Sequence, residues 1–180
     1  MDLKDNKINT KSIIYIALFI TLIYISSLIR LNVFSIPFTL QTLAVMLTAC
    51  FLGSKKGLYV VMIYIFMGLV GLPVFTKGGG IFYIAEHTFG YIVAFIPAVI
   101  IIGLNKAKAS KNIFTLILLL FASSIVMLVI GTMYAFILLS ITSNVDLSAF
   151  LTGYFLLFMP TELLKSIAAA MIYFRLKKYI

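Results

Sequence analysis

Two charged residues, Glu162 and Lys165, lie inside the apolar run of residues 147–174. They are three positions apart, so a helix places both side chains on one face. A charge at the centre of a bilayer costs roughly 2.5–3.5 kcal/mol on insertion scales. An acid and a base kept at that cost indicate a polar ligand site between helices. The alternative is an ion pair that only locks the helices together.

The composition is that of an integral membrane protein. Of the 180 residues, 63% are hydrophobic and 11% are charged, whereas soluble domains average roughly 45–50% apolar and about 25% charged residues. Six apolar runs, measured against a spanning length of about 20 residues, predict a single all-α membrane domain over residues 1–180, a compact bundle of six transmembrane helices. The runs are residues 12–29, 39–52, 57–72, 87–104, 112–141 and 147–174.

The Lys and Arg residues are distributed unequally between the connecting segments. With the N-terminus inside the cell, only Arg30 and Lys77 fall in outer segments, and Lys165 lies within the membrane. This bias predicts a cell-membrane protein with both termini cytoplasmic. The same clustering explains the net charge of +9 without a nucleic-acid partner. The inner residues are Lys4, Lys7, Lys11, Lys55, Lys56, Lys106, Lys108, Lys111, Arg175, Lys177 and Lys178.

The depth of the two membrane charges follows from this topology. Lys165 precedes Arg175, at the expected inner interface, by ten residues, or about 15 Å of helix. Lys165 is therefore expected near the midplane of a ~30 Å hydrocarbon core, with Glu162 in its outer half. Neither side chain reaches the inner interface easily, so both are expected to face a cavity or the bundle interior. Pro160 predicts a kink just before them.

The loop that follows the third apolar run combines flexible and apolar residues. Gly78, Gly79 and Gly80 allow backbone conformations closed to other residues, and Phe75 and Tyr83 flank them. This pattern predicts either a lid that folds over a pocket or an ordinary connector.

Further polar residues occur near the outer ends of the runs. His87 is the only histidine and stands beside Glu86. A metal site needs several His, Cys or carboxylate ligands together, so we expect no metal and no cofactor, although His87 can touch a ligand from above. Gln41 and Thr42 can hydrogen-bond either a solute or a neighbouring helix.

Motifs for ATP hydrolysis and for common hydrolases are missing. The sequence has no G-x-x-x-x-G-K-[ST], H-E-x-x-H or G-x-S-x-G pattern. The chain is therefore not expected to be an enzyme, and a pump built from it would take its energy from other subunits. A rival interpretation is a small membrane enzyme acting on lipid, whose catalytic groups would have to come from Glu162, Lys165, Glu86 and His87.

Four segments resemble, in the right order over nearly the whole chain, the BioY family, the biotin-specific substrate-binding components of energy-coupling-factor transporters. Pro-Phe-Thr-Leu-Gln-Thr-Leu-Ala-Val at residues 37–45 and Gly-Leu-Val-Gly-Leu-Pro-Val-Phe at residues 68–75 are quite specific. Thr-x-Gly-Tyr at residues 88–91 and Pro-Thr-Glu-Leu-Leu-Lys at residues 160–165 fit the same pattern.

The resemblance implies a bundle of six helices that captures biotin from outside under closing loops. It also implies a transmembrane coupling protein and two ABC-type ATPases as partners. Ala17 and Thr21 stand where the family has an Ala-x-x-x-Ala contact with the coupling protein. The substrate-binding residues expected on this basis are Glu162, Lys165, Tyr91, Phe75, Tyr83, His87 and Gln41.

The chain departs from the family pattern at two places. Glu162 stands where the family usually has Asp, and Glu-His-Thr-Phe-Gly-Tyr at residues 86–91 replaces Gly-Pro-Thr-Gly-Gly-Tyr. These differences leave open a related vitamin, such as thiamin or riboflavin, as the substrate. A facilitator that works without partners is a further alternative.

Overall fold

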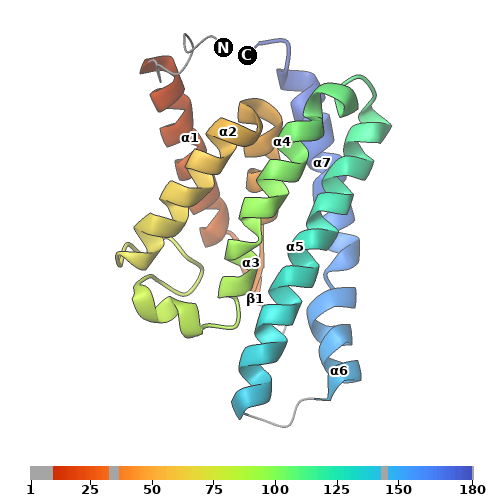
Figure 1. The fold of residues 1–180 in the computed structure, drawn as a ribbon. Coiled ribbons are helices and arrows are strands. Elements are labelled where there is room, and N and C mark those ends of the chain that lie inside the picture. Colours follow the sequence, from red (N-terminus) through yellow and green to blue (C-terminus); the bar gives the residue numbers. More distant parts are fainter. Residues whose placement is uncertain (1–9, 33–36, 143–145, 180) are drawn as a thin grey trace, which may run out of the picture.

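The protein is described by a computed structural model covering residues 10–32, 37–142 and 146–179. It is a bundle of helices with one short hairpin of two antiparallel strands, in which Arg30 pairs with Thr39 (Figure 1). The elements in chain order are α1 (Thr10–Leu28), β1 (Arg30–Asn32), β2 (Pro37–Thr39), α2 (Gln41–Leu69), η1 (Ile81–Ala85), α3 (Phe89–Val93), α4 (Phe95–Ala109), α5 (Ile113–Thr142), α6 (Leu147–Leu151), η2 (Thr152–Leu156) and α7 (Met159–Leu176).

Five helical segments within the described ranges are long and apolar enough to cross a membrane. The helical membrane class expected from the sequence is therefore present, but by this criterion the number of spans is five and not six. The difference arises at α2, which contains both the second and the third expected helix. The five segments are Thr10–Leu28, Gln41–Leu69, Phe89–Ala109, Ile113–Ile141 and Thr152–Leu176.

Helix α2 is folded back on itself at Gly53. This glycine has φ 75° and ψ −177°, a combination that is essentially closed to other residues. The Gln41 side-chain amide donates a 2.7 Å hydrogen bond to the Tyr64 hydroxyl, although a straight helix would hold these residues about 35 Å apart. Helix α2 is thus a pair of limbs, residues 41–52 and residues 54–69, with the reversal visible in Figure 1.

Two residues of α4, Lys106 and Gly103, contact the turn at Gly53 and stabilise it. The Lys106 ammonium donates to the carbonyl oxygens of Cys50 and Phe51, both at 3.2 Å, which the break in the helix leaves without intrahelical partners. Gly103 allows α4 to pass close to the turn, because a Cβ there would stand 2.1 Å from the Ser54 nitrogen.

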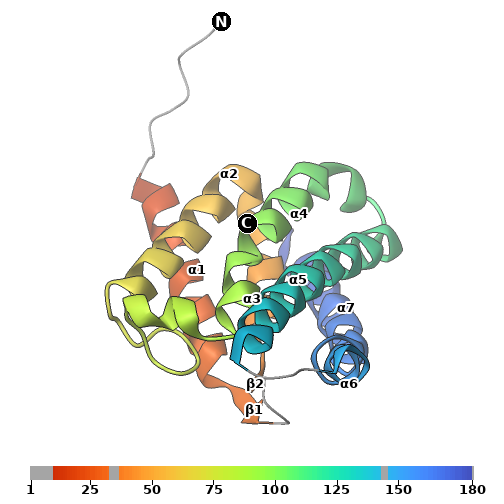
Figure 2. The same ribbon diagram turned by 60° about the horizontal axis from the view of Figure 1, so that its bottom comes forward.

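The main core draws residues from α1, α2, α3, α4, α5 and α7 and from the loop after α2. Ile23, Met46, Tyr64, Val99 and Leu120, from α1, α2, α4 and α5, are almost fully buried. Helix α1 begins and α7 ends at the same end of the bundle (Figure 1). The hairpin and α6 lie at the opposite end, which faces the viewer in Figure 2.

The last apolar run is interrupted where the sequence predicts a kink. A π-helical turn, η2, precedes α7, and Pro160 occupies the first turn of α7. Proline is tolerated there because the first-turn N–H groups have no intrahelical acceptor. This arrangement starts a new helical segment directly before Glu162.

We predict that Gly53→Ala destabilises the protein by about 1–3 kcal/mol, because alanine is strained at this φ and ψ. Thermal unfolding of purified protein in detergent measures the effect. Gly153→Ala is the matched control, since a Cβ at Gly153 meets no atom within 4 Å. It should leave the unfolding temperature unchanged or slightly raised. Equal effects of the two substitutions would contradict the assigned role of Gly53.

Candidate ligand-binding site

A cavity of about 60 Å³ lies between the start of α2, the loop after α2, α3–α4, α5 and α7. At ~10–15 Å³ for each water molecule, measured in the same way, this is room for only a few waters. The lining residues are Thr39, Gln41, Thr42, Thr76, Thr88, Tyr91, Ile92, Phe95, Ser124, Met127, Leu128, Phe158, Glu162 and Lys165.

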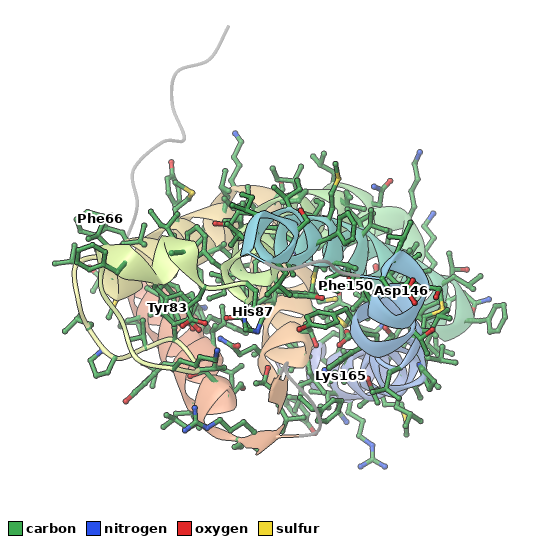
Figure 3. The ribbon with its side chains drawn as sticks, turned by 90° about the horizontal axis from the view of Figure 1, so that it is seen from below. Phe66, Tyr83, His87, Asp146, Phe150 and Lys165 are labelled. Atoms are coloured by element: carbon green, nitrogen blue, oxygen red, sulfur yellow. The ribbon has the colours of Figure 1, made fainter. Side chains whose placement is uncertain are left out.

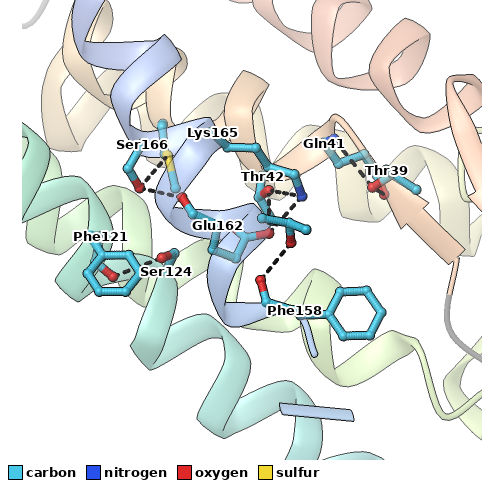
Figure 4. A network of polar contacts seen from close by, with 11 residues as sticks. Thr39, Gln41, Thr42, Phe121, Ser124, Phe158, Glu162, Lys165 and Ser166 are labelled. Carbon is cyan, nitrogen blue, oxygen red and sulfur yellow. Dashed lines mark hydrogen bonds and ion pairs between the residues drawn. The ribbon is translucent and has the colours of Figure 1, made fainter. Parts of the chain in front are cut away.

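Glu162 and Lys165 form a buried ion pair at one wall of this cavity. Only 3% of Glu162 and 6% of Lys165 is exposed, and Lys165 Nζ lies 2.7 Å from Glu162 Oε1. The Thr42 hydroxyl donates to Glu162 Oε1 and accepts from Lys165 Nζ, both at 3.0 Å (Figure 4). Lys165 Nζ also lies 4.3 Å from the ring centroid of Phe38, a favourable cation–π contact.

The second carboxylate oxygen of Glu162 differs from the first. Oε2 is buried and has no hydrogen-bond partner within the described part of the chain. A buried acceptor without a partner is unfavourable, and more so when it carries charge. Because Glu162 lines the cavity, a ligand with an N–H or O–H group can satisfy this oxygen. Oε2 is thus the group in the site that most directly favours a hydrogen-bond donor.

Gln41 is held at the cavity by a chain of hydrogen bonds through α2. Its amide donates to the Tyr64 hydroxyl, which donates to the Val74 carbonyl at 2.8 Å. The Ser27 hydroxyl donates to the same carbonyl at 3.0 Å. These bonds connect the end of α1, both limbs of α2 and the loop after α2, so Gln41 and the loop are positioned together.

The same loop supplies two hydroxyls to the cavity rim. Thr76 and Thr88 line the cavity, and the Tyr83 hydroxyl lies between them, 3.0 Å from Thr76 Oγ1 and 3.2 Å from Thr88 Oγ1. Tyr83 thus stands behind the lining rather than within it. Seen from this end, Tyr83 and His87 point toward the middle of the bundle, whereas Phe66 points outward at its edge (Figure 3).

Phe75 fastens the loop to α2 and does not line the cavity. Its ring occupies the space above Gly68, where a Cβ would stand 2.0 Å from the ring. The Gly80 N–H donates to the Gly68 carbonyl at 2.7 Å. Gly78 and Gly80 have φ values of 119° and 113°, so both need glycine, and Gly79 packs directly against backbone. The three glycines form a tightly attached turn here, and their service as a lid stays a prediction.

Tyr91 and His87 differ in their placement. Tyr91 lines the cavity, and its hydroxyl lies 3.1 Å from Thr132 Oγ1 and 3.2 Å from the Tyr154 carbonyl. His87 is not in the lining. Its ring meets that of Tyr154 edge-on at 6.3 Å, and its Nδ1 is 3.9 Å from Glu86.

Of the seven expected binding residues, the cavity therefore unites Glu162, Lys165, Tyr91 and Gln41, while the other three surround it.

Sequence reasoning did not include Thr42 or Phe38 among the binding residues, although both belong to the motif at residues 37–45. The contact between this motif and Glu162 spans 120 positions, and no local pattern encodes it. Ser124 of α5 also lines the cavity. Among the described residues no three His, Cys, Asp or Glu side chains gather as metal ligands would.

We predict that Glu162→Gln or Lys165→Met alone lowers the free energy of unfolding by about 3–5 kcal/mol, because each leaves one buried charge unpaired. The double variant should recover most of this loss. Denaturant unfolding in detergent micelles measures all three.

Lys77→Met is the matched control, because it breaks the exposed Lys77–Glu86 pair, also 2.7 Å long. It should change stability by less than about 1 kcal/mol. Losses from the two single variants that simply add in the double variant would contradict the coupling between Glu162 and Lys165.

Known proteins resemble the chain over most of its length. Biotin transporter BioY from Thermotoga maritima is 34% identical over 170 residues, which cover 93% of this chain and 96% of that protein. A probable biotin transporter BioY from Lysinibacillus sphaericus is 44% identical over 95 residues. That alignment spans about half of each protein, 53% of this chain and 48% of the relative.

A solved structure has the same fold. It is a crystal structure of the S-component for biotin from an ECF-type ABC transporter, with a TM-score of 0.80, 30% sequence identity, and coverage of 94% of this chain and 92% of that one. The sequence profile of the BioY family matches residues 3–180. The chain therefore belongs to the BioY family.

Proposed function

We propose that this protein is the biotin-binding subunit of an ATP-driven energy-coupling-factor importer. The observation that carries the proposal is the buried Glu162 Oε2, which lacks a hydrogen donor among the described residues and belongs to a residue that lines the cavity. The relatives named above, which are described as biotin transporters and as an S-component for biotin, support the choice of ligand. The subunit binds its ligand and changes none of the ligand's bonds.

The chemistry of biotin suits the cavity. The ureido ring has two N–H donors and a carbonyl, the thioether ring is apolar, and the tail ends in a carboxylate. Glu162 Oε2 accepts a ureido N–H, and Lys165 donates either to the ureido oxygen or to the tail carboxylate. Tyr91, Phe95 and Met127 supply apolar surface for the ring. Phe75, Tyr83 and His87 remain proposed contacts of a state in which the loop has moved.

We propose that the cavity widens when the ligand enters. The loop after α2 is the proposed lid, because it carries Thr76 at the rim of the cavity. Gly80 attaches it to the end of α2, and the Val74 carbonyl attaches it to Ser27 of α1. Its movement outward enlarges the space above Glu162. Its return covers the ligand and excludes water.

The importer needs partners. We propose a transmembrane coupling protein and two ABC-type ATPases, since the sequence has no phosphate-binding loop. Ala17 and Thr21 are the proposed contact with the coupling protein. Both are exposed on α1, and the Thr21 hydroxyl donates to the Ala17 carbonyl at 3.0 Å, so it needs no other acceptor. Small residues on such a surface favour close approach of another helix.

A lipid-modifying enzyme is the less suitable alternative. Of the four groups available for catalysis, Glu162 and Lys165 line the cavity, whereas Glu86 and His87 do not. Glu86 is instead paired with Lys77 at the surface.

We predict that purified protein binds biotin and that Glu162→Gln weakens binding roughly 10- to 150-fold, the loss of one charge-assisted hydrogen bond. Lys165→Ala should weaken binding by at least about tenfold for the same reason. Isothermal titration calorimetry in detergent measures both, with thermal unfolding as a check that each variant is folded.

Lys77→Ala is the control and should bind as wild type. Wild-type affinity of Lys165→Ala would remove Lys165 from the site. Competition by thiamin or riboflavin but not by biotin would identify another vitamin as the substrate.

We also propose six crossings, with each limb of α2 counted as one, and both termini cytoplasmic in the cell membrane. The reversal at Gly53, the α4–α5 connection, the start of α1 and the end of α7 lie at one end of the bundle (Figure 1). The first two connections carry Lys55, Lys56 and Lys111. Lys4 and Lys7 of the expected inner set lie outside the described residues.

This topology predicts that a fluorescent protein fused to the C-terminus becomes fluorescent inside bacterial cells, and that alkaline phosphatase fused at the same point is inactive. The control is a fusion of each reporter after Lys77, on the proposed outer side, which should give the reverse pattern. An active phosphatase at the C-terminus would overturn the orientation.

A further inference from the structure

Element η1 separates one inward side chain from three outward ones. Tyr83 is 5% exposed, whereas Phe82 is 89%, Ile81 58% and Ile84 41% exposed. A 3₁₀-helix has three residues per turn, so Ile81 and Ile84 share one side, Phe82 lies on a second, and Tyr83 points to the cavity rim. Three large apolar side chains of η1 therefore project from the protein surface. Such an arrangement is unfavourable in water.

Exposed apolar side chains of α2 lie at the helix end to which η1 is attached. Phe66 and Val70, near the end of α2, are each 67% exposed, and Phe66 points away from the bundle (Figure 3). The Gly80 N–H bond to the Gly68 carbonyl places the start of η1 beside this helix end.

The depth of η1 agrees with lipid contact. Helix α5 continues well below the level of η1 in Figure 1. The later turns of α5 still carry exposed apolar side chains, those of Met133, Ile137 and Ile141. An apolar helical surface of this kind indicates that the membrane extends past η1.

Charges flank η1 but do not interrupt its apolar surface. Residues 81–85 include no charged side chain. Lys77 and Glu86, on either side, are bonded to each other at 2.7 Å. Mutual neutralisation of the two flanking charges suits a segment that lies at the boundary between lipid and water.

We propose that Ile81, Phe82 and Ile84 insert into the boundary zone of the adjacent phospholipid leaflet, so that η1 attaches the loop after α2 to the membrane. The occupant of this surface is phospholipid acyl chains. Assignment to the outer leaflet rests on the proposed topology, whereas contact with lipid does not. Because the Tyr83 hydroxyl contacts both Thr76 and Thr88, the lipid-bound segment is linked directly to the cavity rim.

The chain contains no tryptophan, so Phe82→Trp creates a single fluorescent reporter. The variant is reconstituted into nanodiscs of phosphatidylcholine, with ordinary or dibrominated acyl chains. We expect blue-shifted emission, at least twofold quenching by the brominated lipid, and little quenching by aqueous acrylamide.

Two reference variants calibrate the measurement. Ile137→Trp on exposed α5 should be quenched by brominated lipid, and Lys111→Trp in the α4–α5 connection should be quenched by acrylamide. Ile81→Trp replaces Phe82→Trp if the latter does not fold.

Emission typical of water with strong acrylamide quenching would overturn the proposal. Protection from both quenchers would also overturn it, because a protein surface would then cover η1. Neither result depends on biotin binding, so the lipid contact and the proposed function can fail separately.

Discussion

The pairing of Glu162 with Lys165 inside an apolar bundle is the constraint on which the site depends. Neither charge is stable there alone, and each is held by a group that the fold brings from elsewhere: the Thr42 hydroxyl for both, and the Phe38 ring for the ammonium. The start of α2 must therefore lie against α7. That requirement explains why a polar motif directly follows the β1–β2 hairpin and why α7 begins anew at a proline.

The pair is asymmetric, and this asymmetry favours the proposed binding site over a structural lock. A lock would satisfy both carboxylate oxygens from within the protein. Here Oε1 receives two hydrogen bonds, while Oε2 is buried and has no partner among the described residues. The protein thus retains an unfavourable acceptor that a suitable ligand relieves. The free energy gained on relief contributes directly to affinity.

Much of the helical architecture could be predicted from the sequence, because the length of an apolar run is a local property. The runs, the interruption before Glu162 and the convergence of Gln41, Tyr91, Glu162 and Lys165 on one cavity follow from such patterns and from the family resemblance. The placement of Phe75 and Tyr83 does not. An aromatic residue beside glycines can contact a ligand or pack in the core, and the sequence does not distinguish the two. Phe75 packs on α2 because Gly68 has no side chain and leaves space for the ring. The fold-back of α2 likewise depends on contacts of Lys106 and Gly103 with the turn.

The two limbs of α2 have a consequence for the surrounding membrane. Their lengths, about 18 and 24 Å, are less than the ~30 Å thickness of a typical hydrocarbon core. In the proposed topology each limb crosses the membrane once, so lipids beside this side of the molecule would shorten or tilt and the bilayer would be locally thinner. Elastic stress of this kind favours any neighbour whose own surface is equally short. With this topology, the thickness of the bilayer would bias where in the membrane the protein resides and with which proteins it associates.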